Sequence, residues 1–345
     1  MMKSTAPKLL GIALAGMMFH GVGTASAQQV TLRLQHFVPP VAAPHKMFLK
    51  PWADKVMKES GGKLKIEIYP SMGLGGKPPQ IFDQVKDGIV DIGFTLPGYT
   101  PGRFPKSEAF ELPFVFDNPI TTNLAIQDYF DKHLKDEFKD VHVLLLHVHA
   151  GQVFHMRKPI RKFEDFKGLT LRTPSPAGTL LIEALGANAY HSPVTEMASL
   201  LSKGVVDGVM VPFEIVPAFK IHQMVKYHVT TEPRVHTSLF LFAMNKNSYA
   251  KLPHDLKQVI DNNAGRNLAK FAGQVWIDAE KPGIALSKKR GNEFITLSEA
   301  ETAKVRAAGM KARARWVEEM KKKGIDGAAL IADAESMLAK YKGKM

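Results

Sequence analysis

The stretch Phe166–Pro174, with the sequence FKGLTLRTP, places a charged residue at the end of a short apolar segment. Leu169–Thr173 predicts a strand, and Pro174 stops it because proline cannot donate to a sheet. A helix is predicted over Pro176–Leu185, since proline is favoured in the first turn. Arg172 would lie where the strand ends and the helix begins, a place that favours an anion. Its guanidinium matches a carboxylate through two hydrogen bonds. A structural salt bridge or a solvated arginine is the alternative.

Strands and helices alternate on both sides of this stretch. Strands are predicted at Thr31–Phe37, Leu64–Tyr69, Ile89–Leu96, Val141–His149 and Val205–Val211, and helices at Pro44–Lys58, Pro79–Lys86 and Glu196–Lys203. A weak internal repeat accompanies this order. Gly88-Ile89-Val90-Asp91 and Gly204-Val205-Val206-Asp207 each follow a predicted helix and open a strand. The pattern favours an α/β architecture with two similar lobes.

The C-terminal third is predicted to be helical. Pro253–Lys281 has no strong breaker apart from two glycines, and Pro282 is expected to end the helix. Some 28 residues would extend over about 42 Å, enough to lie across two small lobes. A second helix is predicted from the cap Ser298 to Lys323.

The first 27 residues have the pattern of a secretory signal peptide. Lys3 and Lys8 precede the apolar run Leu9–Phe19, and Ala25-Ser26-Ala27 is a small-residue cleavage site. A membrane anchor is the alternative, but a span needs about 20 apolar residues. We therefore expect residues 1–27 to be removed on export, and a periplasmic chain that does not span the membrane.

Composition excludes several classes of protein. The 345 residues are 45% hydrophobic and 23% charged, which is typical of a folded protein with two domains. Without cysteine there is no disulfide, thiolate metal site or cysteine nucleophile. The net charge of +13 is compatible with nucleic acid, an anionic membrane or acidic small molecules. Export argues against nucleic acid as a partner.

Motifs of catalysis are absent from the sequence. It contains no G-x-S-x-G, no H-E-x-x-H and no P-loop, and the glycine-rich Met72–Gly76 is interpreted as a loop. His147, His149 and His155 are the best metal candidates, because two histidines two residues apart share a strand face. A third ligand is not visible, so histidines that are buried or line a pocket are the preferred interpretation. We predict no catalytic residue, no metal and no cofactor.

The stretch Phe166–Pro174 resembles the signature D-L-K-G-L-K-I-R-V-P of TRAP transporter solute-binding proteins, the dicarboxylate/sialic-acid type of receptor of tripartite ATP-independent periplasmic transporters. Other segments resemble the family in the same order: Tyr69-Pro70-Ser71, Leu74-Gly75-Gly76, Leu112–Phe116, Leu185-Gly186-Ala187, Glu196, Gly204–Gly208, Lys226-Tyr227, Asn245 and Leu252-Pro253. The resemblance covers almost the whole chain after the signal peptide.

This resemblance implies a two-lobed α/β periplasmic binding protein of the Venus-flytrap type, with mixed sheets and a long helix spanning both lobes. Lobe I is expected at 28–149 plus about 239–277, and lobe II at 150–238 plus about 278–345. Such a receptor holds an organic acid between its lobes and delivers it to a membrane permease. It is not an enzyme. Arg172 takes the role of the family's carboxylate clamp.

Departures from the family bear on the ligand. Sialic-acid members carry a second arginine where this chain has Gly151-Gln152. The remaining ligand-binding candidates are apolar residues and histidines: His36, Phe37, Leu96, His149, Val194, Val211, Phe213 and His236. An apolar pocket with one arginine favours an aromatic or branched monocarboxylate, unless a protonated histidine supplies a second cation. The open alternatives are a binding protein of another importer or sensor, a metal receptor and an exported enzyme.

Overall fold

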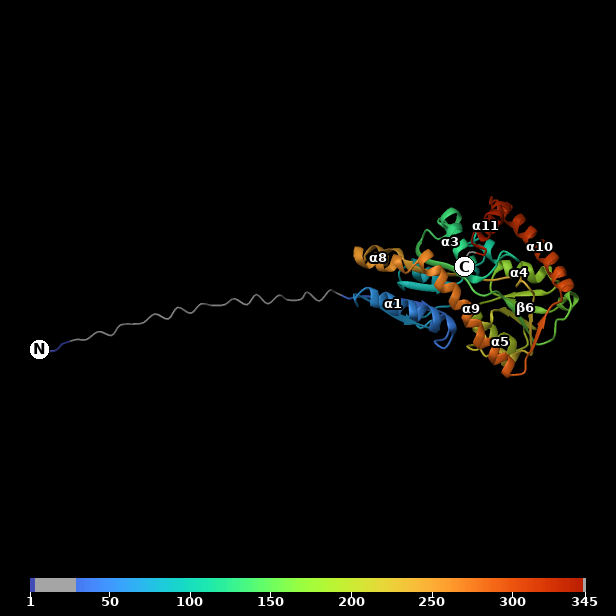
Figure 1. Ribbon diagram of the computed structural model, residues 1–345, viewed down its shortest axis with the longest axis horizontal. Coiled ribbons are helices and arrows are strands. Elements are labelled where there is room, and N and C mark those ends of the chain that lie inside the picture. The colour runs from blue at the N-terminus through green and yellow to red at the C-terminus, as the bar shows by residue number, and fades with distance from the viewer. Residues whose placement is uncertain (4–28, 344–345) are drawn as a thin grey trace.

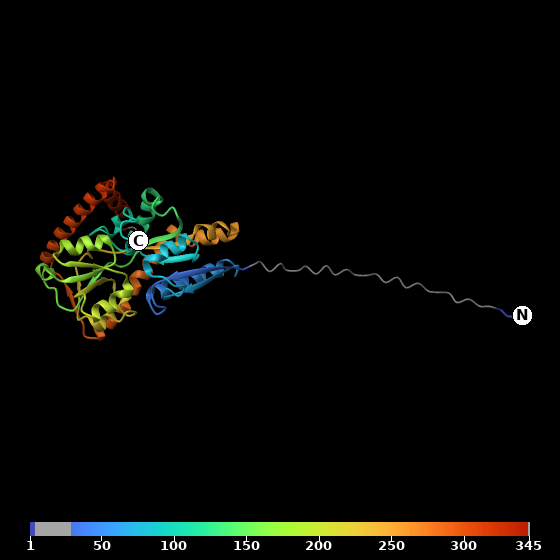
Figure 2. The same cartoon turned by 180° about the vertical axis from the view of Figure 1, so that it is seen from behind.

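The computed structural model describes residues 1–3 and 29–343. The predicted signal peptide at residues 1–27 therefore lies, apart from its first three residues, outside the described residues. The rest of the chain forms two α/β lobes, each built around its own mixed sheet, side by side in Figures 1 and 2. Among the helices of the described part, none is long and apolar enough to cross a membrane.

Lobe I contains a five-stranded sheet of order β2-β1-β3-β10-β4. Its strands are β1 (Val30–His36), β2 (Leu64–Tyr69), β3 (Ile92–Thr95), β4 (Val141–Val148) and β10 (Leu239–Asn245). β1 runs parallel to β2 and β3, whereas β10 is antiparallel to β3 and β4. The helical segments of this part of the chain are η1 (Pro44–Leu49), α1 (Lys50–Glu59), η2 (Pro78–Gln80), α2 (Ile81–Lys86), η3 (Pro97–Tyr99), η4 (Ser107–Glu111), α3 (Pro119–Tyr129), η5 (Phe130–Leu134) and α7 (Lys246–Ala250).

Lobe II contains a six-stranded sheet of order β11-β9-β5-β8-β6-β7. Its strands are β5 (Val153–Met156), β6 (Thr170–Thr173), β7 (Asn188–His191), β8 (Gly208–Val211), β9 (Tyr227–Thr230) and β11 (Glu293–Thr296). β6 runs parallel to both of its neighbours, β7 and β8. The helical segments here are η6 (Phe163–Phe166), α4 (Pro176–Ala184), η7 (Val194–Glu196), α5 (Met197–Ser202), η8 (Phe213–Ile215), α6 (Ile221–Met224) and α10 (Glu299–Lys322).

The two lobes share a local construction that explains the sequence repeat. Gly88 and Gly204 both adopt the left-handed conformation, with φ of +75° and +69°, where glycine is favoured. In each lobe the aspartate three residues later accepts a backbone N–H from a neighbouring strand. Asp91 binds the N–H of Arg33 at 2.8 Å, and Asp207 binds that of Thr170 at 2.9 Å. The repeat is therefore structural.

The prediction of a single helix over Pro253–Lys281 is wrong. Two helices occupy this region, α8 (His254–Asn262) and α9 (Gly265–Lys289). The break follows from a tertiary contact, because the indole N–H of Trp52 donates to the carbonyl of Asn263 at 2.8 Å. Ala264 is then extended, with φ of −133° and ψ of 172°. The chain must turn there before α9 starts.

Pro282 does not end α9 as predicted. It lies inside the helix, which continues to Lys289. A proline within a helix costs about 3 kcal/mol, mainly through the missing N–H and a clash with the preceding turn. Pro282 is exposed, whereas the next residue, Gly283, is buried against lobe II. Packing of the final turns of α9 therefore outweighs the cost of the proline.

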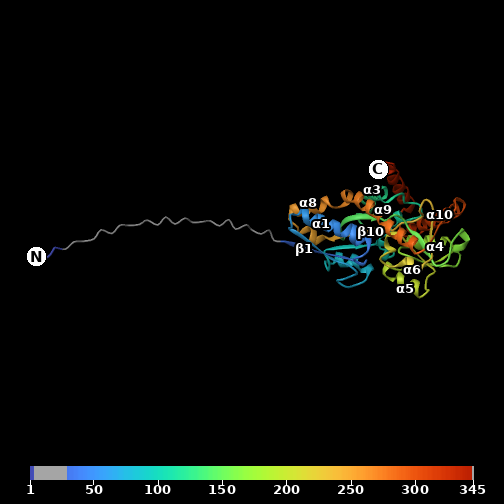
Figure 3. The same cartoon turned by 60° about the horizontal axis from the view of Figure 1, so that its bottom comes forward.

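α9 crosses from one lobe to the other, as Figures 1 and 3 show. It packs against α3 and β4 of lobe I and against η8 of lobe II. Two glycines permit this approach. A Cβ at Gly273 would lie 2.7 Å from the Cα of Ile120, and one at Gly283 would lie 2.0 Å from the carbonyl of Phe213. The predicted contact of one helix with both lobes is thus present, although the helix starts later and ends later than expected.

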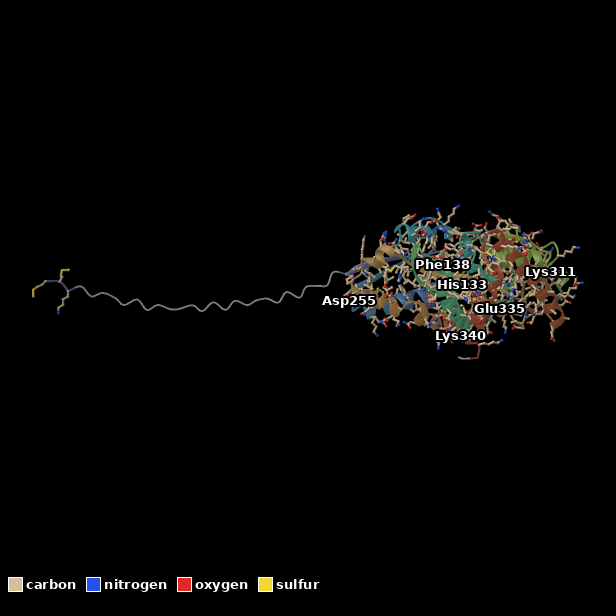
Figure 4. The ribbon with its side chains drawn as sticks, turned by 90° about the horizontal axis from the view of Figure 1, so that it is seen from above. His133, Phe138, Asp255, Lys311, Glu335 and Lys340 are labelled. Atoms are coloured by element: carbon tan, nitrogen blue, oxygen red, sulfur yellow. The ribbon has the colours of Figure 1, made fainter. Side chains whose placement is uncertain are left out.

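The last helix, α11 (Gly327–Tyr341), packs against α3 and η4 of lobe I. The ring of His133 lies 2.7 Å from a carboxylate oxygen of Asp333, and Lys340 pairs with Asp128 at 2.7 Å. His133 and Lys340 lie on the same face in Figure 4. The predicted division of the chain places this segment in lobe II, and α11 also packs against α10 of that lobe. The lobe boundaries stay predictions.

Substituting Gly283 tests the close approach of α9 to lobe II. Gly283→Ala should lower the unfolding free energy by about 1–3 kcal/mol, because the added methyl group overlaps a backbone carbonyl. This loss exceeds the gain of about 1 kcal/mol that alanine brings to a helix. Thermal unfolding measures it, with the exposed Ala285→Ser on the same helix as the control. A melting temperature of Gly283→Ala equal to or above that of the unmodified protein would contradict the packing.

Candidate functional site

A cavity with about 380 Å³ of empty space lies between the lobes. Its wall is mostly apolar. Lobe I supplies Phe37, Val38, Pro44, Leu96, Tyr99 and Phe240; lobe II supplies Arg172, Pro174, Val194, Val211, Pro212, Glu214 and Ile215; the segments that cross between them supply His149, Gln152 and Ser238. A mostly apolar wall with a few polar groups is typical of a site for a small organic molecule.

Arg172 is held rigidly at one wall of the cavity. It projects from β6, which lies between β8 and the edge strand β7, and it is only 1% exposed. Nε donates to the carbonyl of Ser192 at 2.9 Å, and Nη2 donates to the same oxygen. Nη1 makes only long contacts, of 3.4 Å to the Met210 carbonyl and 3.6 Å to the Met197 sulfur. The backbone therefore orients the guanidinium and leaves Nη1 the better placed to donate to an anion.

The charge of Arg172 has no carboxylate of the described residues in direct contact, although Glu196 is near enough to favour the charged form. In residues 29–343, no aspartate or glutamate oxygen lies within 4.0 Å of its guanidinium. Burial lowers the pKa of Arg172, but a guanidinium remains protonated in proteins. A buried charge without a partner costs several kcal/mol. An anion entering the cavity would therefore gain an ion pair whose cation is already desolvated and oriented.

Tyr99 provides a second hydrogen-bond donor beside Arg172. Its hydroxyl accepts the backbone N–H of Val194 at 3.1 Å, and burial raises the pKa of the phenol. The hydroxyl hydrogen has no acceptor among the described residues, so it is available to a ligand. Because Tyr99 belongs to lobe I and Val194 to lobe II, the same contact joins the lobes over the cavity.

Six of the nine predicted ligand-binding residues line this cavity, namely Arg172, Phe37, Leu96, His149, Val194 and Val211. Five of them lie on or directly after the strands β1, β3, β4, β6 and β8, and Val194 begins the one-turn helix η7. The structure does not bring His36, Phe213 and His236 into the wall.

Each of those three side chains packs against other residues of the protein instead of facing the cavity. His36 is the neighbour of Phe37 at the end of β1, where adjacent side chains face opposite ways, and its Nε2 lies 2.9 Å from Nδ1 of His45. Phe213 packs edge-on against His155, with ring centroids 5.1 Å apart. His236 packs at the start of α4, where its Nε2 would lie 3.2 Å from a Cβ at Gly178.

The histidines do not supply a second cation. Burial lowers the pKa of His36 to about 3 and that of His236 to about 4. Burial also lowers the pKa of His149 well below its usual value. The backbone N–H of Gly151 lies 3.1 Å from its Nδ1, and that of Ser238 lies 3.1 Å from its Nε2. A doubly protonated ring would therefore place an N–H against a hydrogen-bond donor at both nitrogens, which disfavours the charged form. Among the described residues of the wall, Arg172 is the only side chain that is a cation at neutral pH.

The three metal candidates are engaged separately. His147 accepts the indole N–H of Trp276 at 2.9 Å, His149 contacts backbone N–H groups, and His155 lies 2.7 Å from His228. Within residues 1–3 and 29–343, no three histidine or carboxylate side chains gather in a group suited to a metal.

Sequence reasoning missed several polar and aromatic residues of the wall. Tyr99 and Glu214 lie on one-turn helices whose position depends on the tertiary fold. Gln152 and Ser238 face each other from the two crossing segments, with the amide of Gln152 donating to Ser238 at 2.8 Å. Phe240 stacks between Phe94 and Trp276, 5.1 and 5.3 Å from their rings. A usable signal is the two-residue period of a strand, which places Phe240 on the same side of the chain as Ser238, the residue before β10.

Comparison with known proteins agrees with a binding protein of this kind. Residues 34–320 match the family DctP, bacterial extracellular solute-binding protein, family 7. Among curated proteins, the outer membrane transporter protein TsaT of Comamonas testosteroni is 24% identical over 308 residues, 88% of this chain and 90% of that protein.

Solved structures are more similar still. A marine metagenome TRAP solute binding protein specific for aromatic acid ligands, in complex with metahydroxyphenylacetate, is 43% identical, with a TM-score of 0.89 over 91% of this chain and 100% of that chain. A TRAP solute binding protein from Rhodoferax ferrireducens, with copurified benzoate, is 39% identical, with a TM-score of 0.89 over 91% and 98% of the two chains. The chain therefore belongs to family 7 of the bacterial extracellular solute-binding proteins and is a TRAP solute-binding protein. The predicted family and two-lobed fold are confirmed.

The buried histidines make stability dependent on pH. An unfolded histidine takes up a proton near pH 6.5, but folded His36, His147 and His236 do so only near pH 3 to 4. Below pH 6.5 the unfolded chain therefore binds more protons than the folded chain, so the free energy of unfolding decreases as the pH is lowered. Burial raises the pKa of Glu108 from 4.5 to about 7 and that of Glu111 from 4.5 to about 8, so the stability that their protonated forms contribute is lost as the pH rises from about 4.5 to about 8.

We therefore expect the melting temperature to be highest between about pH 6 and 7 and to fall on both sides. His147→Asn keeps an acceptor near Trp276 but cannot take up a proton, so it should lessen the loss between pH 6.5 and 4. The exposed His254→Asn is the control. Equal pH profiles for His147→Asn and the unmodified protein would contradict a neutral buried His147.

Proposed function

We propose that this protein is the periplasmic receptor of a TRAP transporter for an aromatic monocarboxylate. The observation that carries this proposal is Arg172, a buried, oriented cation with no carboxylate of the described residues in direct contact, in an otherwise largely apolar cavity. A receptor releases its ligand unchanged, and none of the wall residues pairs a nucleophile with a base.

A single cation supports a single carboxylate. The ligand carboxylate would accept from the guanidinium of Arg172 and from the hydroxyl of Tyr99. A second carboxylate in the closed cavity would have no cation, because the histidines nearby are neutral, and an unpaired buried charge costs several kcal/mol. Dicarboxylates and sugar acids with many hydroxyl groups are therefore disfavoured.

The remaining wall suits an aromatic ring. Phe37 and Phe240 present rings that neighbouring aromatic side chains hold in place, and Leu96, Val194 and Val211 complete an apolar surface. Burying a ligand ring against such a surface contributes about 25 cal/mol for each Å² of apolar area removed from water. The relatives with copurified benzoate or metahydroxyphenylacetate support the same ligand class here.

Closure of the lobes would couple binding to transport. Tyr99 reaches across to Val194 at 3.1 Å, and His191 of lobe II lies 3.0 Å from the carbonyl of Gly98 in lobe I. A ligand that bridges Arg172 and Tyr99 would stabilise this closed state, since it binds groups of both lobes. The permease would then receive the closed, loaded receptor.

Calorimetric titration tests the ligand class directly. Benzoate and phenylacetate should bind to the protein without its first 27 residues, whereas succinate and sialic acid should bind at least tenfold more weakly. Tight binding of succinate with no response to either aromatic acid would contradict the proposal.

Replacing Arg172 tests the clamp. Arg172→Lys keeps the charge but loses the planar fork, so benzoate affinity should fall by roughly 1.5–3 kcal/mol. Arg172→Ala should abolish measurable binding. The exposed Arg157→Lys in the same lobe is the control, and circular dichroism checks that each variant is folded. Unchanged affinity of Arg172→Lys and Arg172→Ala would remove Arg172 from the site.

A further inference from the structure

Two polar side chains at the hinge end of the cavity have atoms without a partner. Gln152 and Glu214 are each 4% exposed, and both line the cavity. In the described part of the chain, Oε1 of Gln152 and Oε2 of Glu214 are buried without a hydrogen-bond partner. Buried polar atoms are rarely left in this state, because each costs part of its hydration energy.

Both residues are anchored to other segments of the protein. The amide nitrogen of Gln152 donates to Oγ of Ser238 on the opposite crossing segment, at 2.8 Å. The backbone N–H of Glu214 donates to Glu280 of α9 at 3.2 Å. The side chain of Gln152 and the backbone of Glu214 are therefore held in the cavity wall, and neither belongs to an exposed loop.

The surroundings of Glu214 favour the neutral form of its carboxyl group. Arg234 pairs with Glu280 at 3.0 Å, and Glu280 is a second acid close to Glu214. Burial and the nearby Glu280 raise the pKa of Glu214 well above its usual value. The other ionisable groups towards the cavity are Tyr99 and Arg172. A protonated Glu214 has a hydrogen to donate and an oxygen that accepts.

We propose that Gln152 and Glu214 form a hydroxyl-binding subsite, so that the preferred ligand is an aromatic acid whose ring carries a hydroxyl group. This inference rests on the proposed function, because the carboxylate must first be held by Arg172. A hydroxyl group is both donor and acceptor, and it satisfies the amide oxygen of Gln152 and the neutral carboxyl of Glu214 together. A ligand without that group leaves both atoms unpaired in the closed cavity.

A charged group at the same position is disfavoured. An ammonium or a second carboxylate on the ligand would have to shed its water beside two neutral polar groups. A neutral hydroxyl loses less hydration free energy than a charged group does, and two hydrogen bonds to the subsite replace its hydrogen bonds to water. The subsite thus recognises the ligand's hydroxyl group by hydrogen bonding, whereas Arg172 recognises the ligand's carboxylate by charge.

Calorimetry with pairs of ligands of similar size tests the subsite. The probes are benzoate, the three isomeric hydroxybenzoates and the corresponding methylbenzoates, titrated into the protein without its first 27 residues. At least one hydroxybenzoate should bind fivefold or more tightly than both benzoate and the methylbenzoate of the same substitution. If benzoate binds but no hydroxybenzoate is favoured, the subsite is refuted and the proposed function stands. If none of these acids binds, both fail.

Variants locate the preference. Gln152→Leu and Glu214→Leu should each reduce the ratio of hydroxybenzoate to methylbenzoate affinity to twofold or less. Glu214→Gln is the matched control, because a neutral amide keeps a donor and an acceptor at the same place and should preserve the ratio. A ratio that persists in both leucine variants would place hydroxyl recognition elsewhere and overturn the inference. The comparison of ligands on the unmodified protein stands even if a variant does not fold.

Discussion

The organisation of this protein depends on one buried guanidinium that has no carboxylate partner. The sheet of lobe II places Arg172 at a strand end, Pro174 prevents the strand from covering it, and the carbonyl of Ser192 holds its plane. A natural protein rarely retains a buried, unpaired charge for stability, because pairing or an apolar side chain costs less. The arrangement is explained by a ligand that supplies the missing anion.

The remainder of the fold brings a second lobe to that charge. β10 returns to lobe I after strands β5 to β9 of lobe II, and β11 later completes the sheet of lobe II. α9 touches both lobes where glycines allow backbone contact. The cavity therefore lies among elements from distant parts of the sequence, with Tyr99 on one side and Arg172 on the other. Neutral, buried histidines around it contribute packing and hydrogen bonds and leave the ligand's charge to a single residue.

Local patterns in the sequence predict much of this structure, and tertiary contacts explain the rest. The alternation in Leu64–Tyr69 and the turn at Gly204 depend on neighbouring residues, so strands and repeat are visible in the chain. The break after α8 is not visible, because its cause is an indole 211 residues away. In the same way, the local sequence does not tell which of His36 and Phe37 faces the cavity, because the two residues are neighbours on opposite faces of a strand end. Tyr99 and Glu214 required knowledge of how the lobes meet.

Exchanging the ligand's charge for a neutral group of the same shape is the most direct test of this account. Benzoate and benzamide differ little in size, and only benzoate can neutralise Arg172. Calorimetric titration of the unmodified protein should show benzoate binding about 100-fold or more tightly than benzamide, because the amide leaves a desolvated cation unpaired. Equal affinities for the two ligands would show that the charge of Arg172 is not what the site is built around.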